Sequence, residues 1–310
     1  MRLLFFGTSA FAVPSLEALV ERRHQILRCI TQPDRPQGRG LRPHPSPVKM
    51  AATKLGLPVE EPADVRASLS AWQSDRPDLG VVIAYGRILP RDVLSLPRHG
   101  MVGVHPSRLP RYRGANPIAW PILEGQTATA VTVFRLNERM DAGDIAVQRD
   151  VPIAPNDTTD TLSHRLASLG ASFLLETIVQ IEQGSVRWTP QDDTQATVAR
   201  KFSKADGRID WTQPAVAIAR LVRAADPWPG AHTTCRGEFL KVWKAVGGES
   251  KAAGEPGVIV DASAQGIVVE TGSGRLTIHE LQPAGGRRMQ AGEFLAGHAL
   301  RVGEILGQEP

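Results

Sequence analysis

The first half of the chain alternates short, continuously apolar runs with longer segments in which apolar residues recur at helical spacing. Residues 2–7 form one such run, which ends at a Gly-Thr-Ser turn and leads into a helical pattern over residues 14–20. An apolar run without alternation is typical of a strand that is buried on both faces, as in a parallel α/β sheet. The same pattern predicts a helix at 48–55 and further strands at 25–30, 79–84, 101–104 and 130–134. We therefore expect the chain to begin with a doubly wound α/β domain.

The pattern changes after residue 187, where Thr, Gln and Asp replace the apolar periodicity. One amphipathic helix is predicted at 214–224. Beyond it, short β-like runs are separated by Gly-rich turns, at residues 239–244, 257–261, 266–270 and 275–281. Short strands at this spacing are typical of a small barrel or sandwich. The sequence therefore predicts a first domain over 1–186, a linker over 187–206 and a second domain over 207–310.

Composition narrows the class of protein but does not identify its chemistry. The 310 residues suffice for two domains, and no apolar run approaches the ~20 residues that cross a bilayer. The only cysteines, Cys29 and Cys235, lie far apart in the sequence, which suits a reducing cytoplasm and argues against a disulfide scaffold. A formal charge of +4 is compatible with a polyanionic partner. The eight histidines lack ligand spacing, so we expect no metal site.

His105 and Asp141 are the residues best placed for chemistry. His105 follows the predicted strand at 101–104, and Asp141 follows the one at 130–134. Open α/β sheets bind their ligands at the carboxyl ends of the strands. A carboxylate beside a histidine favours the imidazolium form of the ring, so the pair would suit proton transfer. Spacing alone leaves the alternative open that His105 lies on a surface loop and Asp141 in an ordinary turn.

A long loop rich in proline and glycine follows the second predicted strand, at residues 31–45. It carries Arg35, Arg39 and Arg42, and Lys49 follows it. Loops of this length inside a compact domain are usually functional or disordered, and arginine suits phosphate groups. The loop therefore fits either a site for a phosphate backbone or a solvated surface segment.

Motifs throughout the chain carry a resemblance to a known family. In the first half they are the segments 6–12, 31–40, 45–49, 84–90, 107–114 and 140–145. In the second half they are the segments 204–211, 226–230 and 281–289. On these residues the sequence resembles the methionyl-tRNA formyltransferases, a family of folate-dependent formyltransferases, over almost its whole length. The resemblance implies an α/β fold with a Rossmann-like formyltransferase domain, followed by a small OB-fold-like β-barrel domain that contacts tRNA.

The resemblance also implies a reaction, the transfer of the formyl group of 10-formyltetrahydrofolate to the α-amino group of methionine on initiator Met-tRNA. In that reaction His105 would assist proton transfer and stabilise the oxyanion. Asp141 would keep His105 charged and position a water molecule that carries a proton. We expect a cytoplasmic monomer whose partners are initiator Met-tRNA and the folate co-substrate, with no metal and no membrane.

Two sets of binding residues follow from the same resemblance. The folate would be held, partly through backbone groups, by Ile83, Tyr85, Gly86, Ile88, Leu89, Pro90, Ser107, Arg108, Leu109 and Pro110. The tRNA would be bound by Arg35, Arg39, Arg42, Lys49, Lys201 and Lys204.

Gly103 departs from the family pattern, in which an asparagine two positions before the central histidine donates a hydrogen bond to the formyl oxygen. Loss of one such donor typically costs about 10²–10³ in rate. Arg108 is a milder departure, because leucine is usual at that position.

Two alternative functions stay open at this point. One is a folate-dependent formyltransferase that acts on an amino sugar nucleotide, and the arginine-rich loop and the second domain argue against it. The other is a homologue that binds tRNA or folate with impaired catalysis, and the retained His105 and Asp141 argue against that.

Overall fold

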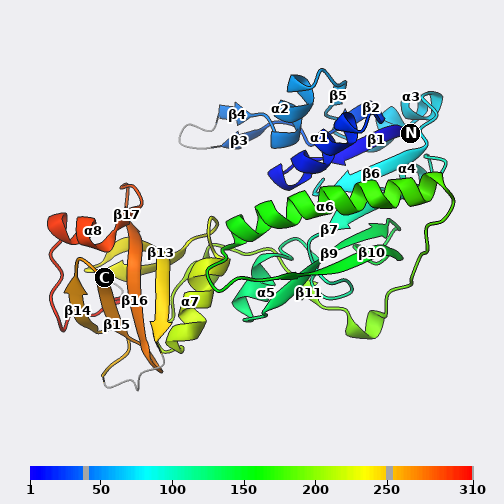
Figure 1. The fold of residues 1–310 in the computed structure, drawn as a ribbon. Helices are drawn as coiled ribbons and strands as arrows, with labels where there is room; N and C mark the ends of the chain where they lie inside the picture. The colour runs from blue at the N-terminus through cyan, green and yellow to red at the C-terminus, as the bar shows by residue number, and fades with distance from the viewer. Residues whose placement is uncertain (38–41, 249–253, 309–310) are drawn as a thin grey trace. The chain divides into compact units, whose positions relative to one another are not determined.

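The computed structural model of the protein describes residues 1–37, 42–248 and 254–308, which form two compact units (Figure 1). Unit 1 comprises Met1–Pro117, Ala128–Pro152 and Ser163–Arg200. Unit 2 comprises Ile118–Thr127, Ile153–Leu162 and Lys201–Pro310. The chain therefore contributes two short segments to unit 2 before residue 200.

Unit 1 is built on a seven-stranded sheet with the strand order β10-β9-β7-β6-β1-β2-β5. Its strands are β1 (Arg2–Gly7), β2 (Gln25–Ile30), β5 (Val59–Glu60), β6 (Leu79–Ile83), β7 (Met101–His105), β9 (Ala128–Arg135) and β10 (Ile145–Pro152). The five strands from β5 to β7 pair in parallel, and β9 is antiparallel to both β7 and β10. This confirms the predicted Rossmann-like α/β fold, to which the structure adds β5 and β10.

Helices and two small sheets complete unit 1. The helices are α1 (Val13–Glu21), α2 (Pro47–Lys54), α3 (Leu69–Ser74), α4 (Arg91–Leu94) and most of α6 (Thr159–Glu182), with 3₁₀ turns η1 (Ala10–Ala12), η2 (Val65–Ser68) and η3 (Asp193–Gln195). The small sheets pair β3 (Arg35–Gln37) with β4 (Arg42–His44), and β8 (Arg113–Gly114) with β11 (Val198–Ala199). Segment 187–206, predicted as a linker, thus contains η3 and a strand that pairs with β8.

Helix α6 approaches the sheet closely at one glycine. A Cβ atom at Gly170 would lie 2.7 Å from Cγ1 of Val104 on β7 and 3.6 Å from Cγ1 of Val131 on β9. The missing side chain therefore lets the helix backbone lie directly against these two strands, beside which Figure 1 draws it. Strand β7 carries His105 at its carboxyl end, so this packing fixes the strand that positions the candidate site.

Strand β1 explains why the sheet reads as continuously apolar in the sequence. Leu3, Leu4, Phe5 and Phe6 are all inaccessible to solvent, so both faces of the strand are covered. On one face the Phe6 ring makes edge contacts with Trp72 and Tyr85, at centroid distances of 5.4 and 5.5 Å. The parallel strands end together at one edge of the sheet, where ligand sites of this class of fold form.

Unit 2 contains an antiparallel sheet with the strand order β12-β13-β16-β15-β14, and β17 pairs with β16. The strands are β12 (Ala231–Cys235), β13 (Glu238–Gly248), β14 (Ile259–Ser263), β15 (Gly266–Glu270), β16 (Arg275–Pro283) and β17 (Met289–Gln290). The helices are α5 (Ala119–Leu123), α7 (Ala215–Ala224) and α8 (Ala291–Gly297), with the 3₁₀ turn η4 (Ala205–Gly207).

The sheet of unit 2 is consistent with the predicted small barrel. Leu306 forms a bridge to Cys235 on β12, and its neighbour Ile305 forms one to Val258 just before β14. One short segment near the C-terminus therefore touches both outer strands of the five-stranded path, which reduces the exposed edge of the sheet.

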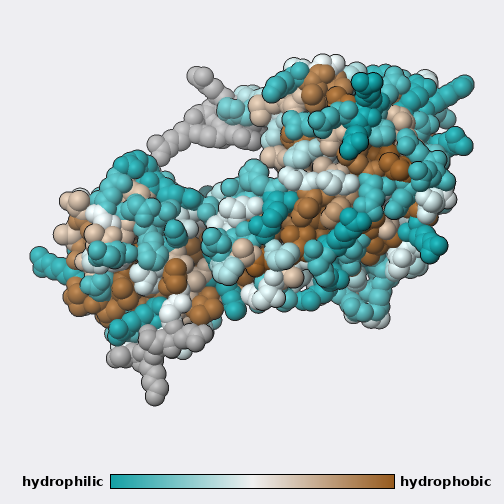
Figure 2. Space-filling view, in the orientation of Figure 1, coloured by the Kyte–Doolittle hydropathy of each residue, from teal (hydrophilic) through white to brown (hydrophobic). Residues whose placement is uncertain are grey.

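The surface is mixed in character. Hydrophilic residues cover most of the face drawn in Figure 2, with apolar patches between them. Within the described part of the chain, no helix combines the length and apolar character needed to span a membrane.

Candidate active site

His105 is the last residue of β7 and lies at the carboxyl edge of the sheet, as predicted. Its side chain is buried, and its ring makes an edge contact with Phe134 on the neighbouring strand β9. All five residues of β7 are buried, as expected of a strand that is covered on both faces of the sheet.

The hydrogen bonds of Ser107 assign the tautomer of His105. The Ser107 hydroxyl donates to the carbonyl oxygen of Arg111 at 2.7 Å and lies 2.9 Å from His105 Nδ1. A hydroxyl has one proton, and a carbonyl oxygen only accepts, so Ser107 must accept the bond from His105. Nδ1 therefore carries a proton, and Nε2 is the nitrogen that faces Asp141.

Asp141 lies beside this second nitrogen. Its Oδ2 is 3.2 Å from His105 Nε2 and accepts a hydrogen bond from the Gly114 N–H at 2.8 Å. Nε2 is buried, and its contact with Asp141 falls outside hydrogen-bond geometry, so the two groups form an ion pair when the ring is protonated. Burial raises the pKa of Asp141, but His105, the Gly114 N–H and Arg113 together hold that pKa below its usual value.

The backbone around Asp141 is held in an uncommon conformation. Asp141 has φ of 52°, a left-handed value that side chains other than glycine adopt rarely and aspartate tolerates best. Gln191 holds this turn, because its Nε2 donates to the carbonyl oxygens of Asp141 and Gly143 at 2.9 and 2.7 Å. Arg113 in turn donates to Gln191 Oε1 at 2.7 Å. Sequence reasoning missed Gln191, since it lies fifty positions after Asp141 in a segment without periodicity.

Gly103 lies on β7, and its side-chain position is occupied by neighbours. A Cβ atom there would lie 2.9 Å from Leu136 Cδ1, 3.0 Å from Phe134 Cε1 and 3.1 Å from the Val82 carbonyl oxygen. The site is therefore packed around a glycine at this position and has no vacant space shaped for an asparagine.

Two family models match the chain in sequence. One is described as Formyl transferase and matches residues 1–178, and the other is described as Formyl transferase, C-terminal domain, and matches residues 201–299. A methionyl-tRNA formyltransferase of Roseiflexus castenholzii is 46% identical, over 99% of this chain and 99% of its own. One of Moorella thermoacetica is 44% identical with the same coverage of both chains. The chain belongs to the methionyl-tRNA formyltransferase family of formyl transferases.

Solved structures share the fold of this formyl transferase. HypX from Aquifex aeolicus in complex with tetrahydrofolic acid gives a TM-score of 0.67 at 22% identity, over 96% of this chain and 48% of HypX. The present chain thus spans about half the length of HypX. An N-formyltransferase from Helicobacter canadensis, in complex with folinic acid and dTDP-3-aminofucose, gives 0.68 at 17% identity, over 90% of this chain and 98% of its own. At these identities the likeness concerns the fold alone.

The first predicted folate segment is divided between core and surface. Ile83, Tyr85 and Leu89 are buried, and the Tyr85 carbonyl oxygen accepts hydrogen bonds from Thr8 Oγ1 and Gln32 Nε2. Gly86 and Ile88 are exposed, with 73% of Ile88 accessible, and Pro90 precedes α4. Among the predicted folate residues of this segment, only Ile88 has an exposed side chain, and Gly86 offers its backbone alone.

The second predicted folate segment adjoins His105. Ser107 and Leu109 are buried, whereas Pro110 is half-buried and Arg108 is exposed. Arg108 forms an ion pair with Asp150 on β10, so its positive charge is balanced within the protein. Folate binding by both segments remains a prediction.

The predicted tRNA-binding residues lie on several elements. Arg35 lies on β3 and Arg42 on β4, whereas Arg39 lies outside the described residues. Lys49 pairs with Asp34 at 2.9 Å and with Glu61 at 2.7 Å, which raises the pKa of its ammonium group. Lys201 and Lys204 are exposed and belong to unit 2. The role of these residues in tRNA binding remains a prediction.

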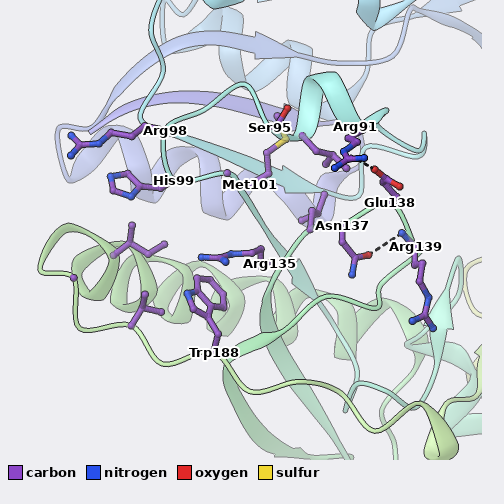
Figure 3. A pocket seen from close by; sticks show the side chains of 16 residues that line it. Arg91, Ser95, Arg98, His99, Met101, Arg135, Asn137, Glu138, Arg139 and Trp188 are labelled. Carbon is purple, nitrogen blue, oxygen red and sulfur yellow. Dashed lines mark hydrogen bonds and ion pairs between the residues drawn. The ribbon is translucent and has the colours of Figure 1, made fainter.

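A cavity of about 870 Å³ lies in unit 1 at the opposite end of β7 (Figure 3). Met101, the first residue of that strand, contributes to its wall. Across the cavity the guanidinium of Arg135 stacks 4.3 Å from the centroid of the Trp188 ring, and Arg91 forms an ion pair with Glu138. None of the residues predicted for catalysis or folate binding lines this cavity. In the described ranges there is no group of three or more His, Cys, Asp and Glu side chains placed to hold a metal ion.

Replacing Asp141 by asparagine tests the charge at the site, since asparagine also tolerates the left-handed backbone. We expect Asp141→Asn to lower the free energy of unfolding at pH 7 by about 1.5–3 kcal/mol, the range for a hydrogen bond to a charged group. A lowered pKa in the folded state stabilises the fold above the unfolded pKa of about 3.9 and loses this effect as pH falls below it. Urea unfolding between pH 7 and pH 3 should therefore show the two proteins converging below about pH 4. A constant difference would contradict this assignment.

Restoring asparagine at Gly103 tests the packing around that position. We expect Gly103→Asn to lower the free energy of unfolding by about 1–3 kcal/mol, because the new atoms overpack Leu136 and Phe134. The cost should be smaller in a Leu136→Ala background, since the closest contact is then removed. Equal costs in both backgrounds, measured by urea unfolding, would refute this explanation.

Proposed function

We propose that this chain transfers the formyl group of 10-formyltetrahydrofolate to the α-amino group of methionine on initiator Met-tRNA. The observation that carries the proposal is the 3.2 Å contact of His105 Nε2 with Asp141 Oδ2, which lies within the residues that match the Formyl transferase model. The 46% identity over nearly the full length to a protein named methionyl-tRNA formyltransferase supports this acceptor.

His105 would act on the formyl group through Nε2, because Nδ1 is engaged by Ser107. Nε2 is a buried nitrogen without a hydrogen-bond partner in the described chain, and the formyl oxygen of the co-substrate would provide one. A protonated Nε2 would donate to that oxygen and stabilise the negative charge that develops as the amine attacks. Since Gly103 offers no side chain, this donor would carry more of the stabilisation.

Asp141 would assist the proton transfer that the reaction requires. The transfer forms a bond between the amine nitrogen and the formyl carbon and breaks the bond between that carbon and N10 of the folate. The amine loses one proton, and N10 gains one. With its lowered pKa, Asp141 is negatively charged at neutral pH and would attract the protonated ring and hold the water that carries this proton.

Two large apolar side chains that adjoin predicted site residues in the sequence are exposed to solvent. Ile88 follows β6 and is 73% exposed, and Met140, which precedes Asp141, is 51% exposed. Large apolar side chains in such exposed positions are available to pack on a ligand. They support folate binding at this edge of the sheet.

The tRNA would be bound by basic side chains on both units. The exposed Lys201 and Lys204 support this, as do the positions of Arg35 on β3 and Arg42 on β4, and the formal charge of +4 agrees with a polyanionic partner. The cytoplasmic location and the monomeric state remain predictions from the sequence.

Formylation of charged initiator tRNA by the purified protein is the direct test. With 10-formyltetrahydrofolate as donor, we expect formylmethionyl-tRNA to form. His105→Asn should lower kcat by about 10²–10⁴, the usual contribution of a positioned acid or base. His99→Asn is the matched control, because His99 lies at the other end of β7 and should leave kcat unchanged. Faster formylation of an amino sugar nucleotide would contradict the acceptor, and wild-type protein that forms no product with either would contradict the reaction.

A further inference from the structure

Three residues on neighbouring strands lie in one row behind the candidate site. His105 on β7 is the register partner of Thr132 on β9, and Thr132 is the partner of Gln148 on β10. Residues directly opposite one another in antiparallel strands present their side chains on the same face. The row therefore runs from the candidate catalytic histidine to two polar residues that the sequence did not single out.

Hydrogen bonds in this row all have a defined direction. Gln148 Nε2 donates to Thr132 Oγ1 at 2.9 Å and to the Leu109 carbonyl oxygen at 2.8 Å. The Thr132 hydroxyl donates its single proton to the Ser107 carbonyl oxygen at 2.7 Å. Thr132 and Gln148 therefore both donate to backbone carbonyl oxygens in the segment that follows His105, one on either side of Arg108.

This anchored segment contains Ser107, which orients the His105 ring. Ser107 accepts the bond from His105 Nδ1 while its hydroxyl donates to the Arg111 carbonyl oxygen. The position of the Ser107 backbone therefore decides where its oxygen meets the imidazole ring. Thr132 is fully buried, so no water competes for its bond to Ser107.

We propose that Thr132 and Gln148 are positioning residues that hold the Ser107–Leu109 segment and, through Ser107, the orientation and tautomer of His105. This role rests on the proposed function, since it concerns the same reaction. Thr132 and Gln148 reach the site only through the backbone oxygens that they bind. Their hydrogen bonds are made in the protein itself, so the site is organised before substrate arrives.

Thr132→Val tests the proposal with little change in volume, because it replaces a hydroxyl by a methyl group. Misplacement of a catalytic group typically costs about 10- to 100-fold, and we expect kcat to fall by that factor with KM for Met-tRNA unchanged. The pH dependence of kcat should also shift, because the ring nitrogens lose their fixed roles. Thr132→Ser keeps the hydroxyl and should restore both the rate and the pH profile.

Thr129→Val is the matched control on the same strand. Thr129 is also buried, but its Oγ1 has no hydrogen-bond partner within the described chain, so the substitution removes no bond. Its kcat and pH profile should equal those of the wild type. Gln148→Leu should resemble Thr132→Val, and the double variant should lose little more than either single variant, because both act on one network.

Amide hydrogen exchange gives a readout that does not depend on activity. The N–H groups of Leu109 and Arg111 donate to the carbonyl oxygens of Ser107 and Arg108, which lie in the anchored segment. We expect both to exchange faster in Thr132→Val than in Thr129→Val. Equal exchange and equal kcat in these two variants would overturn the positioning role, even with active wild-type protein. Wild-type protein without formyl transfer, but with the expected difference in exchange, would overturn the proposed function and leave the anchoring intact.

Discussion

The hydrogen bond from the Ser107 hydroxyl to the Arg111 carbonyl oxygen is the constraint on which the site depends. It uses the only proton that Ser107 has, so His105 must donate from Nδ1. A neutral ring then presents a lone pair on Nε2, 3.2 Å from Asp141, and a second proton on Nε2 converts this contact into an attraction. One hydroxyl proton thereby decides which nitrogen faces the carboxylate and the reacting groups.

The sheet supplies the rigidity that this arrangement needs. Gly170 lets α6 lie directly on β7, and the register of β7, β9 and β10 places Thr132 and Gln148 in line with His105. Catalytic groups gain from being held before the reaction, because no reorganisation is then needed during it. Gly103 contributes to this close packing, since Phe134 and Leu136 occupy the position where a side chain would lie.

The sequence predicted the parts of the molecule that apolar patterning determines. Strand β1 can be predicted from the sequence because Leu3 to Phe6 are all buried and form an apolar run. His105 and Asp141 can be predicted as site residues because family motifs surround them. Strand β10 was missed, because an outer strand with only one fully buried residue has no continuous apolar run. Gln148 and Gln191 were missed because a polar residue that bonds backbone oxygens far away in the sequence resembles a surface residue. The packing of Leu136 against Gly103 depends on tertiary structure and leaves no local pattern.

A single spectroscopic measurement tests directly which nitrogen of the neutral His105 ring carries the proton. The ¹⁵N chemical shifts of the His105 ring can be followed from pH 5 to pH 9, with the His105→Asn variant used to assign them. The Nδ1 shift should be that of a protonated nitrogen throughout, because Nδ1 donates to the Ser107 hydroxyl. A neutral ring that carries its proton on Nε2 would contradict the account, because Ser107 would then have to donate to His105 and could not also hold Arg111.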